Sequence, residues 1–161
     1  MGYFATPAQV SAAPGRATPL TLERITTALD SQGWRYATDE DGQVYGGWDG
    51  HNFYFLRMGR NETMLMVRGR WEARLPLGMD NSVLPVLNDW HQEYFFPKAF
   101  LVDFPDDGNS RVFTEVTIDC AHGITDDQLL THIHAGIDMS LALFKKLNEA
   151  FPGLQQTEDD E

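Results

Sequence analysis

Apolar residues recur at the three- and four-residue spacing of an amphipathic helix in three segments of the chain. The first helix is predicted to begin at the cap Thr18 and to stop at Gly33, where glycine lets a helix end. The second covers residues 82–94, and the third follows a Thr125–Gln128 capping box and runs to residue 150. The pattern therefore predicts one helix near each end and one in the middle.

Between these helices apolar and polar residues alternate, as they do in strands of an antiparallel sheet. Residues 43–74 contain three such runs, QVYGGW, HNFYFLRM and TMLMVRGRWE, which are divided by D-G-H and G-R-N-E turns. Residues 34–38 form a short strand before them, and residues 99–104 and 111–120 form two strands after them. This order predicts an α+β fold, in which an antiparallel β-meander sheet has its helices packed mainly on one face.

The hairpin formed by residues 52–72 is predicted to have one core face and one different face. A turn at residues 59–62 pairs Met58 with Thr63 and puts Phe53 opposite Arg68. The core face then carries Tyr54, Leu56, Met58, Leu65, Val67 and Trp71. The other face carries an apolar centre, made of Phe53, Phe55, Met64 and Met66, ringed by His51, Arg57, Arg68 and Arg70.

These last eight residues are the candidate protein-interaction site, because interfaces combine an apolar centre with arginine. Five of the twelve basic residues of the chain fall in residues 43–74, where they would attract an acidic partner or an acidic segment of a second subunit. Plain packing is the alternative: helices would cover both faces, and arginine stems would lie over the aromatic rings. A one-residue change of register would also exchange the faces.

Length and composition predict a single folded domain. A chain of 161 residues with 42% hydrophobic residues can bury a substantial core. The domain is expected to cover residues 19–152. Residues 1–18 are expected to be a disordered N-terminal arm, and residues 153–161 a disordered acidic tail.

Charge and cysteine content limit the partners and the compartment. The net charge of −12 would repel nucleic-acid phosphates, so no nucleic-acid partner is expected. The single cysteine, Cys120, suits a reducing compartment. No apolar run is long enough to cross a membrane, and the N-terminal residues lack the basic and apolar regions of a secretory signal. A cytoplasmic protein without a membrane partner is therefore predicted.

No constellation of residues specifies a reaction, a metal or a cofactor. His132 and His134 are two residues apart on a helix and point in different directions, unlike the His pair of a zinc helix. Cys120 lies close to His122, but it also shares the alternation of Ile118, which favours a core position. No nucleophile-elbow or phosphate-binding motif is present. The chain is predicted not to be an enzyme, and a thiol enzyme using Cys120 with His122 is the alternative.

A different alternative is a domain that senses a small molecule. The aromatic residues Trp48, Trp71, Trp90 and Tyr94 would then line a pocket between the sheet and a helix.

Five short motifs, in their order along the chain, resemble the YbjN family of bacterial proteins, whose members are described as sensory-transduction regulators. They are Gly46–His51, Arg68–Trp71, Leu87–Trp90, Phe96–Ala99 and Gly123–Leu129, and together they look like the actinobacterial branch of that family. The resemblance covers residues 20–152, and its motifs are turn, strand and capping elements without a catalytic signature.

This resemblance implies a fold similar to that of type III secretion chaperones. It also implies a non-enzymatic, protein-binding or regulatory role, an unidentified protein partner and a homodimer. The family pattern implies three strands after the first helix, whereas four are predicted here. Either two of the predicted runs are one bent strand, or this branch of the family has an additional strand.

Overall fold

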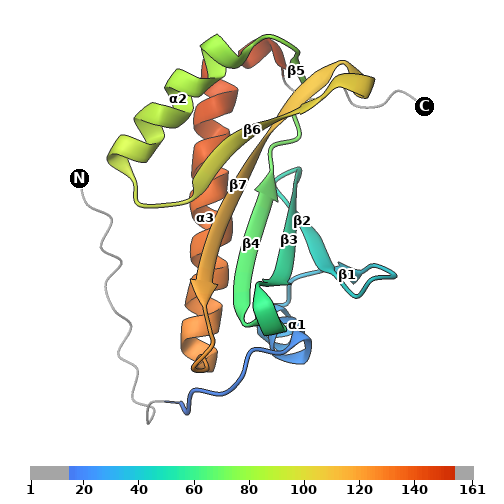
Figure 1. The fold of residues 1–161 in the computed structure, drawn as a ribbon, viewed down its shortest axis with the longest axis vertical. Helices are drawn as coiled ribbons and strands as arrows, with labels where there is room; N and C mark the ends of the chain where they lie inside the picture. The colour runs from blue at the N-terminus through green and yellow to red at the C-terminus, as the bar shows by residue number, and fades with distance from the viewer. Residues whose placement is uncertain (1–14, 155–161) are drawn as a thin grey trace.

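The computed structural model describes residues 15–154, which form three α-helices and a seven-stranded antiparallel sheet (Figure 1). The helices are α1 (Leu22–Ser31), α2 (Asp80–Glu93) and α3 (Asp126–Ala150). The strands are β1 (Ala37–Thr38), β2 (Val44–Trp48), β3 (His51–Met58), β4 (Met64–Arg70), β5 (Leu75–Pro76), β6 (Lys98–Phe104) and β7 (Asn109–Asp119). Short 3-10 turns lie at Arg60–Glu62, Pro105–Asp107 and Pro152–Leu154. The predicted α+β class is confirmed.

The first helix begins one turn later than predicted. The side chain of Thr21, not Thr18, caps α1, because its hydroxyl accepts the backbone N–H of Arg24 at 3.2 Å. Thr18 instead exchanges two backbone hydrogen bonds with Ile124, of 3.2 and 2.9 Å. Residues 15–18 therefore end in a bridge to the chain just before α3, although the sequence predicts that they belong to the disordered arm. The rest of the predicted arm and tail, residues 1–14 and 155–161, lies outside the described residues.

The start of α3 confirms the predicted capping box. Thr125 accepts the backbone N–H of Gln128 at 3.1 Å, and the Gln128 side chain accepts the backbone N–H of Thr125 at 3.0 Å. This reciprocal pair satisfies two N–H groups that a helix start otherwise leaves unpaired. The helix thus has a fixed origin at the end of the sheet, from which it runs behind β7 (Figure 1).

The strands form a sheet in the order β1-β2-β3-β4-β7-β5, and β6 pairs with the other side of β7. The predicted register of the β3–β4 hairpin is wrong by one residue, because Met58 pairs with Met64 and Phe53 pairs with Gly69. Two residues of the turn, Asn61 and Glu62, have left-handed backbones with φ of 64° and 54°. They belong to a turn that is one residue longer than predicted, which moves every cross-strand pair.

The helices pack on one face of the sheet, and α3 approaches it most closely. A Cβ added to Gly136 of α3 would lie 2.6 Å from the Cβ of Val67, so only glycine permits this contact. On the sheet side, a Cβ at Gly69 would lie 2.5 Å from the hydroxyl of Thr114 and 2.9 Å from Phe53. The two glycines let the helix lie directly on β4.

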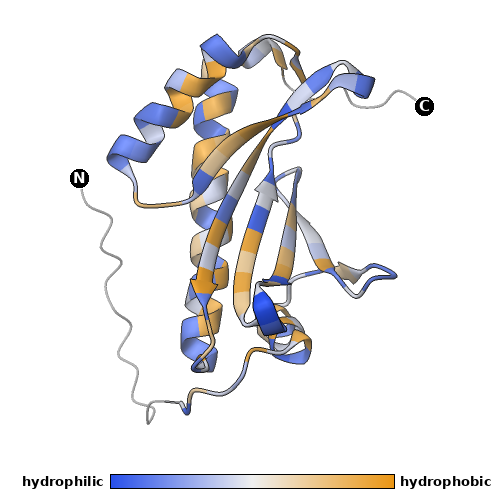
Figure 2. Ribbon diagram, in the orientation of Figure 1, coloured by the Kyte–Doolittle hydropathy of each residue, from blue (hydrophilic) through white to orange (hydrophobic). Residues whose placement is uncertain are grey.

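The core between α3, α1 and the sheet is rich in aromatic rings. Trp48 makes edge contacts with Trp34, Phe53 and Phe55, at centroid distances of 5.5, 5.6 and 5.7 Å. Hydrophobic residues alternate with polar ones along β3, β4 and β7, whereas the tip of the β1–β2 hairpin and the 3-10 turn after β3 are hydrophilic (Figure 2). This core fixes which face of each strand is left uncovered.

Candidate protein-interaction surface

The face of the sheet opposite α3 has no helix over it among residues 15–154, and we call it the open sheet face. The strand register defines it, since residues directly opposite each other share a face. Its apolar side chains are partly exposed, and its charged side chains gather on β4, β6 and β7. They are Tyr45, Tyr54, Leu56, Met58, Met64, Met66, Phe100, Val102, Phe104 and Phe113, with Arg68, Arg70, Glu72, Lys98, Arg111 and Glu115.

The structure divides the eight predicted interaction residues between the two faces. Met64, Met66, Arg68 and Arg70 lie on the open sheet face. His51, Phe53 and Phe55 are buried on the helix-covered face, so their placement on the exposed face is wrong. Arg57 also belongs to the covered side, because it pairs with the buried Leu65, and it forms a 3.0 Å ion pair with Glu62 at the hairpin end. The one-residue difference in register accounts for all four misplacements.

His51 is a structural residue of the core. Its ring lies 4.8 Å from the ring of Phe144, and its Nδ1 accepts the backbone N–H of Glu72 at 3.3 Å. Burial lowers the pKa of His51 against the smaller opposing effect of the Glu72 and Asp49 charges. The neutral ring, which can accept this hydrogen bond, is therefore the form that folding favours.

Glu115 is the centre of the first charged cluster on the open sheet face. Its side chain is only 5% exposed, and it forms ion pairs with Lys98 and with Arg68, whose Nε donates to it at 2.9 Å. Burial raises the pKa of Glu115, but the hydrogen bonds and charges of Lys98 and Arg68 outweigh burial and lower it overall. The carboxylate thus stays ionised and holds two cations in place.

Glu72 is the centre of the second cluster. It accepts hydrogen bonds from Arg70 Nε and from Asn52, both at 2.8 Å, and from Arg111 at 3.3 Å. Burial raises the pKa of Glu72, but Arg70, Asn52 and Arg111 together lower it by more. Each cluster therefore contains two basic groups around one carboxylate and has a surplus positive charge.

Aromatic and methionine side chains occupy the space between and beside the clusters. Phe113 stacks on Phe100 at a centroid distance of 6.1 Å, and Tyr45 lies 6.1 Å from Tyr54. Leu56 and Met66 are cross-strand partners in the middle of the face. The arrangement can bury apolar groups of another molecule and pair with carboxylates beside them.

Sequence reasoning missed several members of this face. Tyr54 and Leu56 were assigned to the core by the wrong register. Glu72 and Glu115 were not connected with the arginines, because pairing across strands depends on the order β4-β7-β6. The alternation of β7 did place Glu115 opposite the core residues, and that was the available signal.

The alternative chemistries have little support in the geometry. Cys120 is buried, and burial raises the pKa of its thiol, whereas a nucleophilic cysteine needs a lowered one. Residues 15–154 contain no group of three or more His, Cys, Asp or Glu side chains placed to hold a metal ion. Within the same residues, no helix is both long and apolar enough to cross a bilayer.

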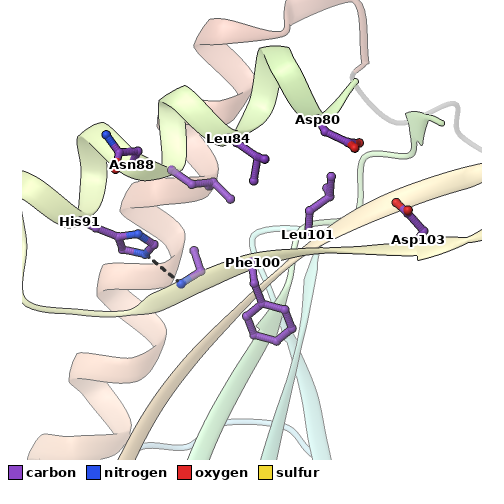
Figure 3. Close-up of a pocket in the computed structure, with 9 residues that line it drawn as sticks. Asp80, Leu84, Asn88, His91, Phe100, Leu101 and Asp103 are labelled. Atoms are coloured by element: carbon purple, nitrogen blue, oxygen red, sulfur yellow. Dashed lines mark hydrogen bonds between the residues drawn. The ribbon is translucent and has the colours of Figure 1, made fainter. Parts of the chain in front are cut away.

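The four aromatic residues predicted to line a ligand pocket have other roles. Trp71 and Trp90 are buried, Trp71 donates its indole N–H to Asn148 at 2.8 Å, and Trp90 stacks on Tyr94. A groove of about 550 Å³ lies instead between α2 and β6. Figure 3 shows Leu84 of α2 and Leu101 of β6 pointing into it, while Phe100 points away toward the open sheet face. His91, at the end of this groove, accepts the backbone N–H of Ala99 at 3.1 Å.

Comparison with known sequences decides the family. The profile of the YbjN family, described as "Putative bacterial sensory transduction regulator", matches residues 21–149. This chain belongs to the YbjN family. No curated protein sequence matches it.

Solved structures show the same YbjN fold. YbjN from E. coli, described as "a putative transcription regulator", has 16% sequence identity and a TM-score of 0.67, covering 83% of this chain and 96% of that one. An uncharacterized protein from Methanothermobacter thermautotrophicus has 17% identity and a TM-score of 0.56, covering 82% and 99%. At such identities the likeness concerns the fold alone.

Proposed function

We propose that this chain is a non-enzymatic interaction module that binds a protein segment through its open sheet face. The observation that carries the proposal is an uncovered sheet face with partly exposed aromatic and methionine side chains between two charged clusters. Interfaces favour aromatic, methionine and arginine side chains at their centre. The description of the YbjN family as regulators supports a role in which binding, not chemistry, is the output.

The surplus charge of the clusters defines the chemistry of the partner. Glu115 neutralises one of Arg68 and Lys98, and Glu72 neutralises one of Arg70 and Arg111. A partner segment with apolar side chains flanked by carboxylates fits this pattern. The same carboxylates hold the arginine side chains in fixed orientations, which lowers the entropy lost on binding.

A capture experiment with matched variants tests the proposal. Met66→Glu places a carboxylate at the apolar centre, and Leu84→Glu makes the same change at an exposed leucine of α2. We expect Met66→Glu to reduce capture of partner proteins from the native host by about tenfold or more, which corresponds to about 1.4 kcal/mol. We expect Leu84→Glu to capture the same proteins as the unmodified chain. Equal capture by all three would exclude the open sheet face.

A small-molecule sensor is the second candidate, and the groove between α2 and β6 favours it. Its volume of about 550 Å³ suits a small ligand, and leucines line it beside polar groups such as Asn88 and His91. A ligand bound there raises the melting temperature of the chain. Leu84→Glu abolishes that rise and Met66→Glu leaves it unchanged, so the pair of variants separates the two functions.

We propose a cytoplasmic location for the chain. A single buried Cys120 needs no oxidising environment, which supports the proposal that the chain works in the cytoplasm. The net charge of −12 supports a protein partner over a nucleic acid.

A further inference from the structure

One side of β7 has an edge that no strand covers among the described residues. β6 pairs with β7 from Phe104 opposite Asn109 to Lys98 opposite Glu115, and it does not reach further. The remaining stretch of β7, residues 116–119, continues past the start of β6 with α3 behind it (Figure 1). β4 covers the other side of this stretch.

The backbone groups of Thr117 and Asp119 point toward the uncovered side. Cys120 N–H donates to Thr63 at 2.8 Å and Trp71 N–H donates to Val112 at 3.0 Å, so the even-numbered residues of β7 bond to β4 and its extension. In an antiparallel ladder the orientation alternates, and Thr117 and Asp119 therefore face away from β4. Both residues are exposed. An edge of this kind is a template for another strand.

An apolar groove runs beside this edge, between β7 and α3. We call it the edge groove, and it is lined by Phe96, Ile118, Thr131, His132 and Ala135. Asp127 is the only acidic residue that lines one end of the edge groove. Glu115 lines the other end, where Lys98 neutralises its charge. The edge itself adds one further carboxylate, Asp119, which accepts the backbone N–H of Ala121 at 2.8 Å. On a chain with a net charge of −12, few acidic groups therefore oppose the approach of two copies here.

A projecting side chain stands at the β6 end of the groove. Phe95 lines this end and is fully exposed, with a relative accessibility of 105%. The exposed phenylalanine ring is a protrusion and the apolar groove beside it is a recess, so one patch of the surface carries both. A two-fold symmetric interface requires this self-complementarity, because each copy must supply both halves of the contact.

We infer that the edge of β7, the edge groove and Phe95 form the surface through which two copies of this chain associate. The free backbone groups determine the register. With a two-fold axis at Ile118, Thr117 of one copy pairs with Asp119 of the other, and both pairs exchange N–H and C=O groups. This register uses every outward-facing backbone group of residues 117 and 119, and it puts the two Ile118 side chains together.

The same axis accounts for Phe95. It exchanges the two ends of the groove, so Phe95 of each copy moves to the end of the partner groove that Asp127 and Thr131 line. Two seven-stranded sheets then join edge to edge into one continuous sheet. The inference does not depend on the proposed function, since association is measured with the chain alone.

Mass measurement on the full chain tests the inference. Sedimentation velocity over a concentration series should show the mass of two 18.2 kDa chains. Phe95→Ser and Thr117→Pro should weaken association by about tenfold or more. The first removes the ring, and the second removes the outward N–H without removing a hydrogen bond to β4. Leu84→Ser, which changes an exposed leucine away from this edge, should not. A monomer at every concentration overturns the inference, as does a dimer that Phe95→Ser leaves unchanged.

Amide hydrogen exchange gives a second readout that needs no variant. The amides of Val116 and Ile118 bond to β4, so they should be protected at all concentrations. The amides of Thr117 and Asp119 should exchange fast in dilute solution and slow as the dimer forms. Slow exchange of this pair that does not depend on concentration means that the chain covers its own edge, and fast exchange at every concentration means that nothing does. Either outcome overturns the inference.

Discussion

Both faces of the β3–β4 hairpin carry large apolar side chains, yet one is covered and the other is open. On the covered face Phe53, Phe55, Leu65 and Val67 are at most 1% exposed, and Gly69 and Gly136 let α3 lie against them. On the open face Met66 lies beside Arg68, which is ion-paired with Glu115, and a second ion pair joins Arg70 and Glu72 further along the face. The two faces are similar in hydrophobicity. They differ in that glycines allow a helix to approach the covered face, whereas charged side chains lie beside the apolar groups of the open face.

The largest expected difference compares two adjacent residues of β3. Phe53→Ala removes a ring that is 0% exposed and packs on Trp48 and Phe144, so it should lower the free energy of unfolding by about 3–5 kcal/mol. Tyr54→Ala, on the open face, should lower it by about 1 kcal/mol, as partly exposed side chains do. Urea unfolding of both variants measures the difference. Equal losses would contradict the assignment of the faces.

A smaller difference compares two glycines, each in a strand. Gly69→Ala should destabilise the chain by about 1–3 kcal/mol, because the new Cβ would lie 2.5 Å from the Thr114 hydroxyl and 3.1 Å from the Phe144 ring of α3. At Gly47, on the open face, the nearest atom is 3.9 Å away, so Gly47→Ala should be neutral or slightly stabilising. Thermal unfolding of the two variants is sufficient. A harmless Gly69→Ala would mean that α3 does not lie directly on β4.

The next effect concerns the charges of the open sheet face. Glu115→Gln should lower stability by about 1 kcal/mol at pH 7, a modest amount because Lys98 is 65% exposed and Arg68 34% exposed. The pKa of Glu115 is lower in the folded than in the unfolded chain, so its contribution is present above pH 4.5 and is lost as pH falls through the folded pKa. The difference between wild type and Glu115→Gln should therefore vanish in acid. A difference that stays the same as the pH is lowered would contradict the ion-pair account.

The smallest expected effect is the pH dependence of stability that comes from His51 on the covered face. Because burial lowers the pKa of His51 below the unfolded value of 6.5, the unfolded chain takes up the proton first as pH falls. Stability should decline from about pH 6.5 downward, and His51→Asn, which keeps an acceptor, should decline less. Burial also lowers the pKa of His132, so some dependence of stability on pH should remain in the His51→Asn variant. His122→Asn, at an exposed site, is the control, and urea unfolding at pH 7.5 and 5.5 measures all three chains.

Sequence patterns predicted the elements better than the surfaces. The Thr125 capping box and the alternation of Val112, Thr114 and Val116 are local signals, and both are confirmed. The hairpin register is not local, because it depends on the left-handed residues Asn61 and Glu62 that lengthen the turn. The pairing of Arg68 with Glu115 joins residues 47 positions apart, and no periodicity in the sequence reports it.

Exposed side chains outside the sheet pattern were also missed. Phe95 belongs to no helix or strand, so its full exposure has no signature in a hydrophobic period. The uncovered edge of β7 follows from where β6 begins, at Lys98 after Pro97. Both features appear only when the chain is folded.

Photo-crosslinking tests most directly the claim that the open sheet face binds a protein. A benzophenone amino acid at Leu56, in the centre of that face, is compared with one at Leu84 on α2, in cells of the native host. The account predicts a defined adduct between this chain and another protein from position 56, and loss of this adduct when Met66→Glu is added. No adduct from position 56, or the same adduct from both positions, would contradict it.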